Sequence, residues 1–194
     1  SAGEVELLNI GKSKTAAFCR KWENKEWNAV PTKKTTSDAE NFTFNGIGRC
    51  TVSLIITQKL ADGVKRELRY VIAYDGDSEP EVLVTLSYSN DKHATLQSKF
   101  TLKKGEHEYI FKPNSFKRGN YSFDFVNLKT VAFTLHAEKI GKGTFSLRRV
   151  YVKEGDQRKG TVTALKKTGE RKCAEIFPAG TSENIFFKSG STTL

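Results

Sequence analysis

The chain has 194 residues, of which 37% are apolar, 11% aromatic and 28% charged. This composition excludes an intrinsically disordered chain, and a chain of this length buries a core without needing a metal or a disulfide merely to fold. No apolar run approaches the roughly 18 residues that a membrane-spanning helix requires, and the net charge of +10 indicates a basic surface. Such a surface suits a polyanionic ligand, but solvent-exposed lysine on strands and sheet edges explains it equally simply.

The N-terminal part of the chain shows little regular alternation. Residues 9–45 contain both tryptophans and the polar stretch PTKKTTSDAEN, and this pattern predicts a long loop that crosses the fold. Further along, apolar and polar residues alternate with period two, which is typical of strands that bury one face. The alternating segments are residues 51–60, 66–74, 81–89, 107–112, 130–138 and 144–152. Tyr70, Tyr74 and Tyr88 share parity with Leu and Val in these segments, so we expect them in the core.

Short clusters of Gly, Asp, Asn and Pro separate the alternating segments, and no convincing helical stripe is present. About eight strands joined by short turns predict an all-β fold, an antiparallel β-sandwich. We expect residues 1–156 to form one β-sandwich domain. Residues 157–194 contain further strand candidates at 161–165 and 184–188, which would complete a sheet or form a C-terminal appendage.

One strand candidate, TFSLRRVYV, changes the phase of its alternation. The residues concerned are, in chain order, Phe145 and Leu147 of one parity, Arg148 and Arg149 at the change, and Val150 and Val152 of the other parity. An extra residue in a strand makes a β-bulge, which bends the strand and changes the side chains that face the core. We therefore predict a bulge at the two arginines, which would bind an anion or pair with carboxylates on a neighbouring strand.

Motifs of enzymes are scarce in this sequence. The glycines of GIG (46–48) and GKG (141–143) lack the third glycine of a dinucleotide-binding loop, and neither leads into a helix. His93, His107 and His136 lie far apart without the spacing of a zinc site. We therefore favour a non-catalytic protein, with a hydrolase built on convergent carboxylates as the weakest alternative.

The three cysteines do not follow a metal-binding or redox spacing. Cys19, Cys50 and Cys173 allow a Cys19–Cys50 or a Cys19–Cys173 bridge, and three free thiols agree equally well with the sequence. The pairing therefore stays open at this point.

Aromatic and polar side chains are the best candidates for ligand recognition. Trp22 and Trp27 lie in KWENKEWN, where exposed indoles would stack on sugar rings; burial in the core is the alternative. On the strands, Arg69, Thr85 and His136 have the parity opposite to the large apolar residues. They would form a polar floor if their sheet face is concave, and are ordinary solvent-facing groups if it is flat.

The order of strands and turns in KKGEHEYIFK (103–112) and VAFTLHAEKIGKGTFSLRRVYVKEG (131–155) resembles the closing half of galactose-binding-like jelly-roll domains. These include many carbohydrate-binding modules of polysaccharide-degrading enzymes. The resemblance covers at most residues 51–153. It implies a jelly-roll sandwich with a sugar site on the concave face or among the apical loops. Arg148 and Arg149 depart from it, because acidic or amide residues often occupy those positions in the family.

The same resemblance implies a calcium ion with a structural role. Glu4 and Glu6 in the N-terminal segment EVELLNIG, together with Asp156, supply carboxylates of the type that calcium prefers. They do not define a complete site, so the metal ligands remain unassigned.

These observations predict a non-catalytic, lectin-like carbohydrate-binding module of a larger extracytoplasmic protein, extracellular or at the cell surface. The expected ligand is a polysaccharide or other glycan, and the basic charge favours an acidic one. The expected ligand-binding residues are Trp22 and Trp27 for stacking, with Arg69 and His136 as polar contacts. The alternatives are a protein-interaction or interdomain scaffold contacting other domains of its parent protein, and a polyanion-binding module; nucleic acid is the less favoured partner.

Overall fold

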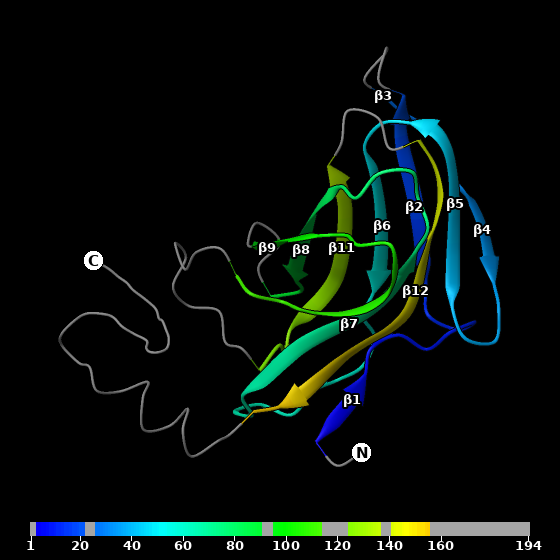
Figure 1. Ribbon diagram of the computed structural model, residues 1–194. Helices are drawn as coiled ribbons and strands as arrows, with labels where there is room; N and C mark the ends of the chain where they lie inside the picture. The colour runs from blue at the N-terminus through cyan, green and yellow to red at the C-terminus, as the bar shows by residue number, and fades with distance from the viewer. Residues whose placement is uncertain (1–2, 22–25, 91–94, 114–123, 137–140, 156–194) are drawn as a thin grey trace. The chain divides into compact units, whose positions relative to one another are not determined.

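The computed structural model describes residues 3–21, 26–90, 95–113, 124–136 and 141–155. These residues form twelve β-strands and no helix, so none of their segments is a helix able to cross a membrane (Figure 1). The strands are β1 (Glu4–Glu6), β2 (Thr15–Lys21), β3 (Glu26–Ala29), β4 (Thr32–Thr35), β5 (Glu40–Ile47), β6 (Cys50–Ile55), β7 (Arg66–Tyr74), β8 (Glu81–Tyr88), β9 (Thr95–Thr101), β10 (Gly105–Ile110), β11 (Leu128–His136) and β12 (Gly141–Glu154).

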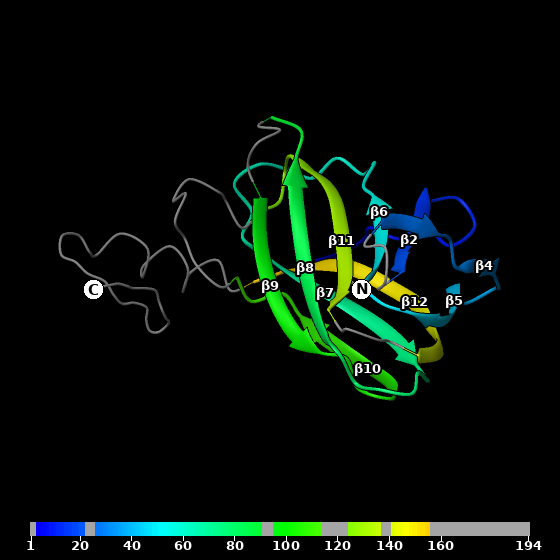
Figure 2. The same cartoon turned by 90° about the horizontal axis from the view of Figure 1, so that it is seen from above.

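The strands form two antiparallel sheets of six strands each. Sheet I has the order β10-β7-β12-β5-β4, with β1 paired to β12, and sheet II has the order β3-β2-β6-β11-β8-β9. Figure 2 shows β9, β8, β11 and β6 following one another in one layer, with β10, β7, β12 and β5 in the other. The expected all-β antiparallel sandwich is therefore confirmed.

The core lies between the sheets and follows the period-two alternation. Strand β7 alternates buried and half-buried residues along its whole length, because its even-numbered residues face the other sheet. Tyr70 packs edge-on against Phe133 at 5.1 Å between ring centroids, and Phe133 lies 5.9 Å from Phe145, so aromatic rings bridge the two layers. Tyr70, Tyr74 and Tyr88 are all buried, as predicted, and burial raises the pKa of Tyr70.

The predicted phase change in β12 is also confirmed. Phe145 and Leu147 before the change and Val150 and Val152 after it are all 0% exposed, and the two arginines between them are half-buried. The strand thus keeps its apolar side chains in the core on both sides of the phase change, and the bulge expected at the two arginines stays a prediction.

The expectation of a long loop over residues 9–45 was wrong. This segment contains β2, β3, β4 and the start of β5. Strand β4 (TKKT) is exposed at all four positions because it lies at the edge of sheet I, so it shows no apolar alternation to detect. The edge strand β9 also escaped prediction, because Leu96 is the sole apolar residue among its buried positions.

The sandwich is built within Ser1–Lys153, the first of two units into which the chain divides. The strand candidates at 161–165 and 184–188 lie outside the described residues, so the expectation for 157–194 stays a prediction.

Candidate functional site

The outer face of sheet I is occupied by ion pairs between its own strands. Arg69 on β7 contacts Glu67 on the same strand (Nη2–Oε1, 2.6 Å) and Glu108 on β10 (Nη1–Oε2, 2.8 Å). The hydrogen bonds that Arg69 donates to the carboxylates of Glu108 and Glu67 raise the pKa of Arg69. The guanidinium is therefore held as a cross-strand link.

The two arginines at the phase change in β12 extend this network. Arg148 contacts Asp38 (Nη1–Oδ2, 2.8 Å) and Glu106 (Nε–Oε1, 2.8 Å). Both carboxylates come from outside β12, because Asp38 precedes β5 and Glu106 belongs to β10. We expected these arginines either to bind an anion or to pair with carboxylates of a neighbouring strand. Arg148 pairs with carboxylates.

Arg149 joins β1 to β12. Its Nη2 lies 2.8 Å from Oε1 of Glu4 and 2.5 Å from Oε2 of Glu6, and its guanidinium carbon stacks 3.6 Å from the ring centroid of Tyr151. The two carboxylates nominated for calcium thus contact a guanidinium. Among the described residues no group of three or more His, Cys, Asp or Glu side chains could hold a metal ion, and Asp156 lies outside them. A structural calcium ion stays a prediction without an assigned site.

In this network on sheet I, three arginines meet six carboxylates. The network is therefore acidic on a chain whose net charge is +10. An anionic ligand would be repelled by the excess of carboxylates, and any ligand would first have to displace formed ion pairs.

The outer face of sheet II differs in kind. Its strands pair in a register that aligns outward side chains in rows across the sheet. One such row, here called the Phe18 row, consists of Phe18, Thr51, Thr134, Leu83 and Lys99 on β2, β6, β11, β8 and β9. Phe18 is 49% exposed, which is unusual for a large aromatic side chain. The hydroxyls of Thr51 and Thr134 are hydrogen-bonded at 2.9 Å.

The neighbouring row carries charge. Here His136 is paired in register with Glu81, and Lys99 of the Phe18 row lies 3.7 Å from Glu81 (Nζ–Oε1). Partial burial, followed by the nearby charge of Arg49, lowers the pKa of His136, while Glu81 acts in the opposite sense. Arg49 and Lys99 against one carboxylate make this end of the face basic, and His136 adds a positive charge on acidification.

On the side of the Phe18 row away from His136, the face is built from small side chains. In the row on the other side of the Phe18 row, Ala16, Ser53, Ala132 and Thr85 lie next to one another. One row further, Ser87 is hydrogen-bonded to Thr130. Small alcohol side chains leave room for a ligand to lie close to the sheet, and they offer both donors and acceptors. Sheet II therefore presents an aromatic ring at one side, hydroxyls in the middle and a basic group beside them.

Two of the four predicted ligand residues, Arg69 and His136, lie on different outer faces. His136 lies on the outer face of sheet II, and Thr85 shares that face, whereas Arg69 lies on the outer face of sheet I. The backbone of Trp27 belongs to β3, which pairs with β2 and so borders the sheet II face. Trp22 lies outside the described residues.

Sequence reasoning missed Phe18. The signal was its parity within TAAFCRK, since Phe18 is opposite in phase to Ala17 and Cys19, which are buried. A phenylalanine of outward parity was concealed because the whole segment had been interpreted as a loop.

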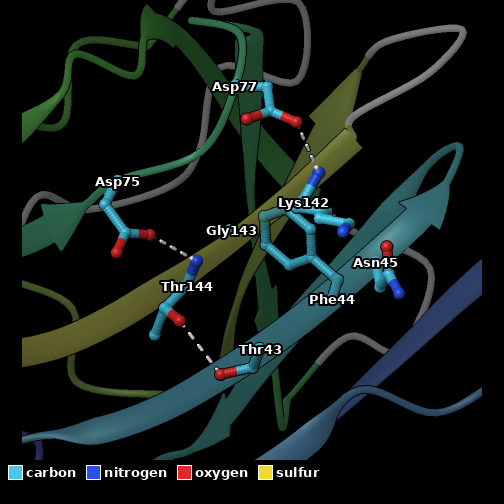
Figure 3. Close-up of a pocket in the computed structure, with 8 residues that line it drawn as sticks. All are labelled: Thr43, Phe44, Asn45, Asp75, Asp77, Lys142, Gly143 and Thr144. Carbon is cyan, nitrogen blue, oxygen red and sulfur yellow. Dashed lines mark hydrogen bonds between the residues drawn. The ribbon is translucent and has the colours of Figure 1, made fainter.

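A depression of about 410 Å³ lies between the end of β5, the start of β12 and the β7–β8 loop (Figure 3). Its lining consists of Thr43, Phe44, Asn45, Asp75, Asp77, Lys142, Gly143 and Thr144. The two aspartates belong to the β7–β8 loop, and they accept hydrogen bonds from the backbone: Thr144 N to Asp75 Oδ1 at 2.7 Å and Lys142 N to Asp77 Oδ2 at 3.0 Å. These hydrogen bonds hold the β7–β8 loop against β12. They explain the orientation of both aspartates without a bound ligand.

The whole sequence was also compared with known proteins. No protein-family model matches it, and neither does any curated protein. Among solved structures, the chain is similar to the family 11 carbohydrate-binding module of the cellulosomal cellulase Lic26A-Cel5E of Clostridium thermocellum. That match has a TM-score of 0.53 and 11% identity, and covers 80% of this chain and 96% of that one.

Two longer chains match as well. The agarase AgWH50C gives a TM-score of 0.54 with 6% identity over 79% of this chain, and PfGH50B gives 0.51 with 8% identity over 75%. The match covers 25% and 23% of those two chains, about a quarter of each. At these identities the likeness concerns the fold, which is the jelly-roll β-sandwich of carbohydrate-binding modules.

Proposed function

We propose that this chain is a non-catalytic carbohydrate-binding module that binds a glycan across the outer face of sheet II. The observation that carries the proposal is the Phe18 row, in which an exposed aromatic ring, paired threonine hydroxyls and a lysine share one face. The likeness of the fold to a module of a cellulase supports it.

The proposed mode of binding assigns a task to each part of the face. The ring of Phe18 stacks on the apolar face of one sugar, because aromatic faces bury C–H surface without hydrogen bonds. Thr51 and Thr134 exchange hydrogen bonds with sugar hydroxyls. Trp22 and Trp27 supply further stacking from the β2–β3 segment, as the sequence led us to expect.

The basic group of this face favours an acidic glycan. Arg49, His136 and Lys99 would receive a carboxylate or sulfate of the sugar, with Arg49 able to bind it through two parallel hydrogen bonds. The carboxylate-rich network on sheet I would direct such a ligand away from the opposite face. We further propose that the module belongs to a larger secreted or cell-surface protein, by analogy with the cellulase module.

Affinity electrophoresis and calorimetry on neutral and acidic polysaccharides test this function. Phe18→Ala should weaken binding about 10-fold, the usual worth of one stacking contact. His136→Ala should weaken binding of acidic glycans alone, at a pH below about 6.5 where the imidazole becomes protonated. Val30→Ala is the control, because Val30 is another exposed apolar side chain, 73% accessible, and lies outside the strands.

Arg69→Ala discriminates between the faces. If the ligand binds on sheet II, this variant binds as the wild type does, whereas Phe18→Ala does not. Two results would contradict the proposed site. One is that no polysaccharide retains the protein in affinity electrophoresis. The other is that Arg69→Ala loses binding while Phe18→Ala, Trp22→Ala and Trp27→Ala keep it. A steep fall of affinity with salt on every polyanion, with no dependence on sugar type, would instead indicate a general polyanion-binding module.

A further inference from the structure

Two of the cysteines meet inside the sandwich. Cys19 on β2 and Cys50, the first residue of β6, are direct partners in the antiparallel register of sheet II. Both side chains are 0% exposed and face the core. The structure shows both as thiols.

The hydrogen bonds around the pair define its geometry. Arg20 N donates to Arg49 O at 2.8 Å, and Ile55 N donates to Lys14 O at 3.0 Å. Arg20 opposite Arg49 and Lys14 opposite Ile55 are therefore hydrogen-bonded pairs. Such pairs alternate with non-hydrogen-bonded pairs along antiparallel strands. Cys19 opposite Cys50 is adjacent to the first of them in the register, so it is a non-hydrogen-bonded pair. At such positions the Cα atoms approach to about 4.5 Å, within the range that a disulfide spans.

The two thiols are in contact. A hydrogen bond with Cys50, together with burial, raises the pKa of Cys19. A buried, protonated thiol is a poor nucleophile and a poor metal ligand, so the folded dithiol is inert toward both kinds of chemistry. What remains open to this pair is a bond between its own two sulfur atoms.

We propose that Cys19 and Cys50 form a disulfide between β2 and β6 when the chain folds in contact with a disulfide oxidant, such as oxidised glutathione or an oxidoreductase. One cysteine thiolate attacks the oxidant's S–S bond, forming a mixed disulfide and releasing one thiol. The thiolate of the second cysteine attacks the sulfur of its partner in that mixed disulfide and releases the other thiol. The two cysteines lose two protons and two electrons, and the oxidant is reduced to two thiols.

Such a bond would lie directly beneath the sheet II face. Phe18 precedes Cys19 and Thr51 follows Cys50, so the bond would fix the spacing of two neighbours in the Phe18 row. It would also close the segment that contains β3, β4 and β5. Closing a segment of this length raises the midpoint of thermal unfolding by roughly 10 °C.

The test uses the full chain carrying Cys173→Ser, which leaves only the proposed pair. The protein is refolded in a mixture of oxidised and reduced glutathione, and the exchange is quenched with acid. Free thiols are then alkylated in denaturant, and the mass of the chain is measured by mass spectrometry. We expect no alkylation, a mass about 2 Da below that of the reduced chain, and a tryptic product linking residues 15–20 to residues 50–59. Reduction should lower the midpoint of thermal unfolding by roughly 10 °C. Cys50→Ser should abolish both the linked peptide and this dependence on reduction.

Two outcomes would overturn the proposal. One is a refolded chain with native spectra in which both cysteines are still alkylated. The other is a wild-type chain in which Cys19 is linked to Cys173 and Cys50 is alkylated. No ligand enters this experiment, so its failure leaves glycan binding untouched, and failure of glycan binding leaves the disulfide unaffected.

Discussion

A methyl group added at Gly143 should detach the β7–β8 loop from β12. A Cβ built on Gly143 lies 2.4 Å from Cα and 2.9 Å from N of Gly76, well inside van der Waals contact. Both obstacles are backbone atoms, so no side-chain rotation relieves the overlap. The loop that contains Gly76 has to move in Gly143→Ala.

The cost follows from what holds the loop in place. Asp77 N donates to Lys142 O at 3.0 Å and Asp75 N to Thr144 O at 3.3 Å, in addition to the two backbone bonds to the aspartate side chains. A net value of about 1 kcal/mol for each of these four bonds, reduced because water replaces part of it at this exposed site, gives about 3 kcal/mol of lost stability. Overpacking in proteins costs typically 1–3 kcal/mol, in agreement with this figure. The midpoint of thermal unfolding should fall by roughly 10 °C.

Gly63→Ala provides the control. Gly63 has a φ of +74° and no atom within 4 Å of a built Cβ, so alanine there meets backbone strain alone, at about 1–2 kcal/mol. Gly143 lacks a positive φ, so its variant meets steric overlap alone. Urea unfolding of both variants therefore compares the two costs in one protein.

Hydrogen exchange locates the damage. The amides of Lys142 and Thr144 donate to the loop carboxylates, so their protection should fall in Gly143→Ala and stay unchanged in Gly63→Ala. The reasoning is refuted if Gly143→Ala is as stable as the wild type, or less damaging than Gly63→Ala, or if the lost protection lies elsewhere.

Three further predictions concern the core, the β1 link and pH. Phe133→Ala should cost about 3–5 kcal/mol in urea unfolding, because the ring is fully buried against Tyr70; a loss below 1 kcal/mol would contradict this packing. Arg149→Gln should cost about 1 kcal/mol and reduce the sensitivity of stability to salt, since it removes partly exposed ion pairs; an unchanged salt dependence would refute their contribution. Because the pKa of His136 is lowered, its positive charge appears only as pH falls below its ordinary value. Affinity for an acidic glycan should therefore rise on acidification below about pH 6.5 in calorimetric titrations, and the same rise in His136→Ala would exclude this group.

Much of the fold could be predicted because it depends on local alternation. A strand with one buried face repeats every two residues, and this was evident in 66–74 and 81–89. The edge strands β4 and β9 have too few buried apolar residues to show this signal, which is why they were missed. The phase change at Arg148 was readable for the same reason, since a bulge alters the local repeat.

The candidate site was less predictable. Parity marks a side chain as outward from its own strand, but it does not say which of the two outer faces that strand serves. Arg69 and His136 have the same outward parity, and pairing between distant strands puts them on opposite sheets. Phe18 was hidden in a segment whose small inward residues, Ala17 and Cys19, do not stand out as apolar.

The sequence by itself determined the class of fold, the inward position of the tyrosines and the change of buried parity in β12, because each follows from residues adjacent in the chain. Only the tertiary structure decided which charges meet, that Cys19 is opposite Cys50, and that Gly143 touches Gly76. These pairings depend on strand order and register, which are determined by contacts between segments far apart in the chain.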